Sequence, residues 1–118
     1  MVSIDEWMHE VEALPGSDGI GMMLAHRGVV RGTTRAGDLV RGMDLRVDRD
    51  RLAQVIAQAQ TLPGIVAVRA WVNEGRLAVG DDIMKVLVAG DIREHVFGAL
   101  QQLVAAIKTG VVMETELL

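Results

Sequence analysis

The side chains best suited to chemistry in this sequence are cationic, and they stand where predicted elements end. Arg31 and Arg35 lie in a polar segment with glycines, residues 31–38, which directly follows an apolar stretch. Lys108 is at the end of a predicted helix. Arginine binds phosphate or carboxylate through paired hydrogen bonds, and a lysine beside an apolar surface can act as an acid, a base or a nucleophile. These residues predict a site for a small anionic ligand or for an acidic protein tail.

A structural role is the alternative for each of these cations. A lysine in the last turn of a helix often only complements the helix dipole. Seven of the twelve basic residues are arginines between positions 27 and 51, where they could pair with nearby aspartates. The arginines are Arg27, Arg31, Arg35, Arg41, Arg46, Arg49 and Arg51, and the aspartates are Asp38, Asp44, Asp48 and Asp50.

Composition narrows the classes of protein and of partner. The chain has 118 residues, half of them hydrophobic, which is typical of one globular domain spanning residues 1–118. A net charge of −4 and only 3% aromatic residues argue against a nucleic-acid partner. There is no cysteine, and the three histidines are scattered, so no metal site and no cofactor is predicted. No apolar run is long enough to span a membrane, and we expect a cytoplasmic protein.

The order of the predicted elements is that of an α+β fold. Apolar periodicity predicts helices at 4–13, from Asp48 or Asp50 to about 61, and at 91–108. Strands are expected at 20–30, 39–47, 65–72, 76–79 and 83–89, and residues 111–118 are either an edge strand or disordered. Asn73, Glu74 and Gly75 have the composition of a hairpin turn, with Gly75 free to take a positive φ.

The stretch 80–108 is the most informative, because it combines a strand, a sharp turn and an amphipathic helix. Asp91 followed by Glu94 has the spacing of a capping box, which predicts that Asp91 caps the helix. Lys108 is then expected on the buried side, next to Ile107. The predicted apolar face of this helix consists of Val96, Phe97, Leu100, Val104 and Ile107.

Two motifs in this order resemble the large, catalytic subunit of molybdopterin synthase. The first, GMMLAHRGVVRG at 21–32, resembles the family's apolar strand followed by a glycine, two residues and an arginine, with Gly28 and Arg31 at the matching places. The second runs from Gly75 to Lys108, and its matching residues are Gly75, Leu77, Gly80, Asp81, Arg93, Phe97 and Lys108. The likeness spans nearly the whole chain, from about residue 20 to residue 116.

The sequence departs from the family pattern at several places. Ile92 stands where the family has the histidine of a His-Arg pair, and Val72-Asn73 replaces an earlier His-Arg. Glu114 stands at the place of a second lysine, whereas the glutamate that ends the family segment is kept as Glu116. A glutamate in place of a pocket lysine works against the binding of an anionic substrate.

The resemblance implies an α/β hammerhead fold and a specific reaction. The family's enzyme is built on a homodimer of large subunits, each with a ubiquitin-like small subunit whose C-terminal Gly-Gly carries a thiocarboxylate. Sulfur passes from this tail to cyclic pyranopterin monophosphate, a small phosphorylated pterin, and forms molybdopterin. On this basis we expect Lys108 to be catalytic and Val30, Arg31, Arg35 and Arg93 to bind substrate, with Arg93 serving the pocket of the other protomer.

Two other interpretations stay open at this point. The chain could be a non-catalytic homodimer of the same fold that binds a ubiquitin-like tail or a pterin without turnover. It could also be an unrelated small α+β module, in which Lys108 and the arginines are ordinary surface charges. The substitutions at Ile92 and Glu114 are the features that separate the first interpretation from the enzyme.

Overall fold

The fold has two parts. One is a three-stranded sheet with helices on both of its faces, and the other is a second three-stranded sheet at one end of the molecule. The structure is a computed structural model that describes residues 2–118. The helices are α1 (Ile4–Glu12), α2 (Arg49–Gln60) and α3 (Arg93–Gly110), with a short 3₁₀ turn at Ser17–Gly19. The strands are β1 (Met22–Val29), β2 (Gly42–Val47), β3 (Ile65–Val72), β4 (Gly75–Ala78), β5 (Asp82–Gly90) and β6 (Val112–Leu117).

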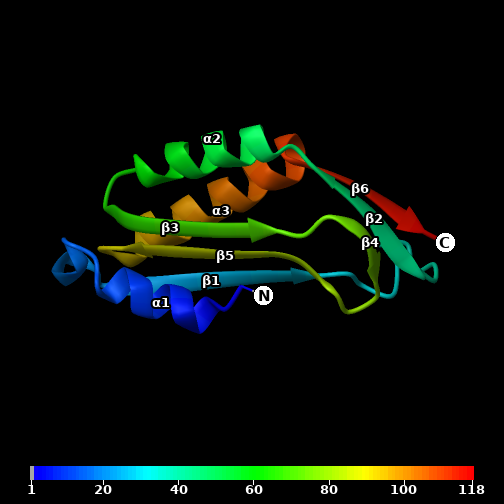
Figure 1. The fold of residues 1–118 in the computed structure, drawn as a ribbon, viewed down its shortest axis with the longest axis horizontal. Coiled ribbons are helices and arrows are strands. Elements are labelled where there is room, and N and C mark those ends of the chain that lie inside the picture. Colours follow the sequence, from blue (N-terminus) through cyan, green and yellow to red (C-terminus); the bar gives the residue numbers. More distant parts are fainter. Residues whose placement is uncertain (1) are drawn as a thin grey trace.

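Both sheets are antiparallel, and they differ in what covers them. The first has the order β1-β5-β3, with α2 and α3 on one face and α1 on the other (Figure 1). The second has the order β4-β2-β6 and extends beyond the helices at the other end of the molecule (Figure 1). This α/β arrangement confirms the predicted α+β class and the hammerhead fold.

The central strand β5 explains why its sequence is apolar without alternation. Val86 and Val88 belong to the main core beneath α2 and α3, whereas Leu87 and Ala89 face the smaller core beneath α1. A strand that is buried on both faces needs apolar residues at consecutive positions.

No helix among residues 2–118 is long and apolar enough to cross a bilayer.

The predicted hairpin at residues 73–75 is wrong, although the turn itself is present. Gly75 does take a positive φ of 99°. The two strands around it do not pair, however, because β3 pairs with β5 and β4 pairs with β2. The turn therefore carries the chain from one sheet to the other.

The end of the chain forms β6, which pairs with β2 at the edge of the second sheet. This confirms the predicted edge strand rather than a disordered tail.

The predictions for α3 require two corrections. Ile92, and not Asp91, is the N-cap; the Asp91 carboxylate instead accepts a hydrogen bond from the Ile92 N–H and lies 2.8 Å from His95 Nδ1. The buried face is also rotated from the predicted one, so that Phe97 is 51% exposed. The residues buried on α3 are Val96, Ala99, Leu103 and Ile107, with Leu100 and Val104 partly buried against them.

Candidate functional site

A cavity of about 700 Å³ lies where the two sheets meet the end of α3. Its polar lining contains three cations and three carboxylates, and its apolar floor comes from the ends of β1 and β5 and from β2. The charged residues are Arg31, Arg35, Lys108, Asp38, Glu114 and Glu116, and the apolar ones include Val29, Met43 and Ile83. Lys108, Arg31 and Arg35, three of the residues predicted to form the site, are thus brought to one cavity.

Lys108 reaches the cavity from the last turns of α3 and is held there by a carboxylate. The helix continues to Gly110, and the chain then returns as β6, which places Glu114 beside the lysine. Lys108 Nζ donates a hydrogen bond of 2.8 Å to Glu114 Oε1. The lysine side chain is 46% exposed and that of Glu114 is 26% exposed, so Lys108 is not on the buried side of the helix as the periodicity suggested.

The loop after β1 presents the two arginines. Arg31 Nε donates to the carbonyl oxygen of Thr33 at 2.8 Å, which leaves the terminal nitrogens of its guanidinium without an ion pair in residues 2–118. The loop is closed by hydrogen bonds from the Asp38 N–H to Thr34 Oγ1 and from the Thr34 N–H to the Asp38 carbonyl. Arg35 likewise forms no ion pair within the described residues.

Two further residues of the predicted site, Val30 and Arg93, do not line this cavity. Val30 is 1% exposed and part of the main core, and its backbone bonds to Gly80 and Asp81, so it anchors the start of the loop. Arg93 is the first residue of α3. It precedes Lys108 by fifteen residues along this helix, which at about 1.5 Å per residue separates their Cα atoms by roughly 22 Å.

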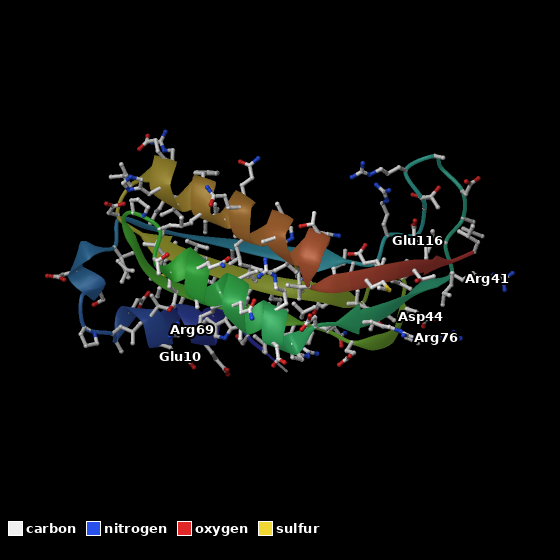
Figure 2. The ribbon with its side chains drawn as sticks, turned by 90° about the horizontal axis from the view of Figure 1, so that it is seen from above. Glu10, Arg41, Asp44, Arg69, Arg76 and Glu116 are labelled. Carbon is white, nitrogen blue, oxygen red and sulfur yellow. The ribbon has the colours of Figure 1, made fainter. Side chains whose placement is uncertain are left out.

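The interpretation of the arginines as partners of nearby aspartates is not supported for the pairs expected. Arg27 pairs with Asp82 and Arg49 pairs with Glu74, both distant in sequence. The hydrogen bond from Arg27 holds the pKa of the Asp82 carboxyl below its usual range. Asp44 pairs with Arg76 on the other side of the second sheet (Figure 2). Among residues 2–118, none of the four aspartates forms an ion pair with Arg31 or Arg35.

Glu116 and Asp38 line the cavity but were not among the residues predicted to form the site. From the sequence, Glu116 was noted only as a glutamate kept from the family segment, and Asp38 only as a possible partner of an arginine. Glu116 lies on the side of β6 that faces the loop (Figure 2). In β6 it is paired with Met43, and Glu114 with Leu45, and both partners are buried. The signal that could have found Glu116 is the two-residue period of residues 112–117, which puts Glu114 and Glu116 on one face of a strand.

A second, apolar cavity of about 600 Å³ runs along the outer side of α3 against β1. Phe97 and His26 lie in it, and the other lining residues are Leu24, Leu100, Gln101, Val104 and Ala105. Burial lowers the pKa of His26, and the positive charge of Lys108 lowers it further. The exposed apolar face formed by these residues extends along α3 between Arg93, at the start of the helix, and Lys108, near its end.

The sequence matches, over residues 1–110, the family model described as MoaE protein. Similar solved structures include molybdopterin synthase from Staphylococcus aureus, at 17% identity and a TM-score of 0.79, covering 98% of this chain and 85% of that chain. The molybdopterin biosynthesis MoaE protein from Burkholderia ambifaria MC40-6 has 22% identity and a TM-score of 0.74, with coverages of 98% and 82%.

A third similar structure is a complex of subunits 1 and 2 of the molybdopterin-converting factor from Helicobacter pylori 26695. It has 12% identity and a TM-score of 0.70, and covers 98% of this chain and 78% of that chain. At such identities these structures show a shared fold. No curated protein matches the sequence.

Proposed function

Because the chain belongs to the MoaE family, we propose that it is the catalytic subunit of a molybdopterin synthase. Family membership supports a role in molybdenum cofactor biosynthesis. The reaction proposed for this chain is the transfer of sulfur from a thiocarboxylated small subunit to cyclic pyranopterin monophosphate. The observation that carries the proposal is the cavity that contains Lys108, Arg31 and Arg35 together.

The size of the cavity and the cations in its lining support this reaction. Pockets for small molecules usually enclose about 300–1,000 Å³, and this one encloses about 700 Å³. Arg31 and Arg35 supply fixed cations for a phosphate group. Acyl transfer from the thiocarboxylate leaves negative charge on the attacked group and a proton to be moved, and Lys108 is the group in the cavity suited to both tasks.

The partner proposed for this cavity is the extended Gly-Gly tail of a ubiquitin-like small subunit. The Helicobacter pylori structure is described as a complex of two subunits, which supports a second subunit for this chain as well. Glycines at the end of the tail suit a cavity whose lining is crowded by charged side chains, because they let a backbone approach closely.

A homodimer would account for the position of Arg93. The exposed apolar face on α3, with Phe97 at 51% exposure, is the kind of surface that a second copy covers. If two copies of α3 pack antiparallel along this face, the partner subunit's Arg93 approaches the end of α3 where Lys108 stands. Arg93 would then add a cation to the cavity of the neighbouring protomer, although it is too far from the cavity of its own protomer to do so there.

The alternative is a homodimer that binds a tail or a pterin without turnover, and one observation favours it. Glu114 occupies one side of Lys108 at 2.8 Å and adds a negative charge where a phosphorylated substrate must bind. In the enzyme, Lys108 must exchange or share this partner when substrate binds. In the non-catalytic protein, the ion pair would simply persist.

One experiment separates the two functions. The purified protein is incubated with thiocarboxylated small subunit and cyclic pyranopterin monophosphate, and the dithiolene product is measured. Product formed by the unmodified chain supports the enzyme. Product formed only by Glu114→Lys would show that this chain has lost the chemistry of its family. Absence of product in both, with the small subunit still bound, would favour the binding protein.

A further inference from the structure

The apolar cavity between α3 and β1 contains one titratable side chain, which the proposed reaction does not use. His26 lines this cavity of about 600 Å³ together with the ring of Phe97 and aliphatic side chains of both elements. Among residues 2–118, the His26 ring has no hydrogen-bond or ion-pair partner. A Cβ at Gly28 would lie 3.6 Å from His26 Nε2, so the ring lies over the next residue on the same face of β1. An imidazole without a polar partner in an apolar cavity is sensitive to whatever covers that cavity.

The outer side of α3 has the properties of a surface that a second copy covers. From Val96 to Ile107 the helix has twelve residues and no charged side chain, whereas a solvent-facing helix normally has a charged face. Phe97 protrudes beside the cavity and is 51% exposed, and a Cβ at Gly98 would meet no atom within 4 Å. The same surface therefore presents an apolar protrusion and an apolar recess, which suits two copies related by a two-fold axis.

The groups around His26 disfavour a positive charge on its ring. From α3, the positive charge of Lys108 helps to lower the pKa of His26. From β6, Glu114 is engaged by Lys108 at 2.8 Å. From β5, the residue opposite His26 is Val86, which is buried and apolar. On β1 itself, the neighbouring Arg27 is a further cation, and it is paired on the opposite side of the strand.

We propose that protonation of His26 separates the homodimer that packs through α3, so that self-association acts as a pH switch. The inference rests on the proposed function, which supplies the homodimer. A second copy covers the cavity and removes the ring further from water, where an imidazolium is costly. The partner subunit's Arg93 and Glu94 bring opposite charges to this end of α3 and thus no net counter-charge. Separation also takes the partner subunit's Arg93 away, so the switch regulates the site as well as the assembly.

Separated protomers bind the proton more strongly than the dimer does. Burial lowers the pKa of His26 below its ordinary value of 6.5 within one protomer, and covering the cavity lowers it further. Dissociation therefore takes up protons, and the dissociation constant must rise as the pH falls below about 6.5. Since each dimer contains His26 twice, the rise can reach about 100-fold per pH unit. Above about pH 7 both rings are neutral, and the constant is then independent of pH.

The test is sedimentation equilibrium of the 118-residue chain at about pH 7.5 and about pH 5.5, at constant ionic strength. We expect the dissociation constant of the wild type to be at least about tenfold higher at the lower pH. His26→Gln and His26→Leu are uncharged at both pH values, and their constants should change by less than about threefold.

The other two histidines of the chain provide matched controls. His9→Gln and His95→Gln should both keep the pH dependence of the wild type, because neither ring lines the cavity. Circular dichroism of the same samples reports whether the protomers stay folded.

Each result supports or overturns a separate claim. A dimer that dissociates at the lower pH in the wild type and both controls, but not in the two His26 variants, supports the switch. The switch is overturned, and the homodimer kept, if the wild-type constant stays equal or falls at the lower pH, or if the dependence is lost in His95→Gln. It is also overturned if the two His26 variants still dissociate at the lower pH or are monomeric at both pH values, or if dissociation of the wild type coincides with loss of the folded signal. A wild type that is monomeric at the higher pH overturns the homodimer and the switch with it, whereas sulfur transfer is tested separately by product formation.

Discussion

Replacing Lys108 by alanine should abolish sulfur transfer while leaving the fold almost unaffected. The side chain is 46% exposed and has one ion-pair partner, Glu114, which is 26% exposed. Ion pairs of this exposure contribute about 0.2–1 kcal/mol, and a lysine in the last turn of a helix adds about 0.3–1 kcal/mol. We therefore expect Lys108→Ala to lower the free energy of unfolding by about 1 kcal/mol, and by no more than about 2 kcal/mol.

The expected effect on catalysis is much larger than this. Loss of a positioned acid or base typically lowers a rate by about 100- to 10,000-fold, which corresponds to about 3–5 kcal/mol of transition-state stabilisation. The two quantities are measured on the same preparation, the rate from dithiolene formation with both substrates saturating and the stability from urea unfolding. Lys108→Arg is the matched control, because arginine keeps the positive charge but does not exchange its proton near neutral pH.

Two results would refute this reasoning. A wild-type rate in Lys108→Ala would remove Lys108 from the chemistry and return it to the role of a helix-end cation. A wild-type rate in Lys108→Arg, with none in Lys108→Ala, would mean that the charge alone matters and that no proton moves through this side chain.

Four further predictions concern the loop, the α3 face, the second sheet and His26. Arg31→Ala should weaken binding of the phosphorylated pterin by about 1.5–3 kcal/mol in calorimetry, more than Arg41→Ala does; equal affinities of the two variants would contradict this. Phe97→Glu should convert the expected dimer into monomer in sedimentation at micromolar concentration, because it places a charge on the apolar face of α3; an unchanged dimer would exclude this face. Gly42→Ala should lower the free energy of unfolding by roughly 1–3 kcal/mol in urea, since its Cβ would lie 2.5 Å from a backbone carbonyl oxygen of β4; wild-type stability would show that the second sheet yields easily. His26→Gln should flatten the decrease in stability between about pH 7 and pH 5, and an unchanged slope would contradict the assignment.

The sign of the pH dependence follows from the direction of the shift. Burial, helped by the charge of Lys108, lowers the pKa of His26 below its ordinary value of 6.5, so the unfolded chain binds the proton more readily. The unfolding free energy must therefore fall as the pH drops below about 6.5 and must level off below the pKa of the folded state. The carboxyls of Asp82 and Asp91 have lowered pKa values, and their contribution is lost only at more acidic pH, below about 4. The two ranges are separate, which makes the His26 variant informative.

Much of the secondary structure could be predicted because it depends on patterns within short stretches. The strand expected at residues 65–72 has these bounds in the structure, and Asp48 does cap α2 by accepting a hydrogen bond from the Arg51 N–H. A two-residue or 3.6-residue period reports burial relative to an element's own axis, and a cap involves residues three positions apart. The capping-box spacing from Asp91 to Glu94 predicted the wrong N-cap. The Asp91 carboxylate lies beside His95, four residues along the chain, and the spacing alone does not show which nearby residue it contacts.

By itself, the sequence determined which side chains are available for chemistry and at which ends of elements they stand. It placed Arg31 and Arg35 after a strand and Lys108 at the end of a helix, and the two motifs gave the order of the family. It did not reveal that Glu114 holds Lys108 or that Glu116 faces the loop, and it could not place Arg93 relative to the cavity.

Only the tertiary structure decided these relations, because they depend on which strands pair and which side of a helix is covered. A turn at Gly75 with a positive φ is compatible with β4 pairing back on β3 and also with β4 crossing to β2. In the structure β4 pairs with β2, because β3 is already paired with β5 in the other sheet. Phe97 lies at the margin of the apolar stripe of α3. Whether a residue at such a margin is buried depends on whether another element packs against it, and here Phe97 stays exposed. Contacts between distant residues are set by the packing of whole elements, and local periodicity contains no record of that packing.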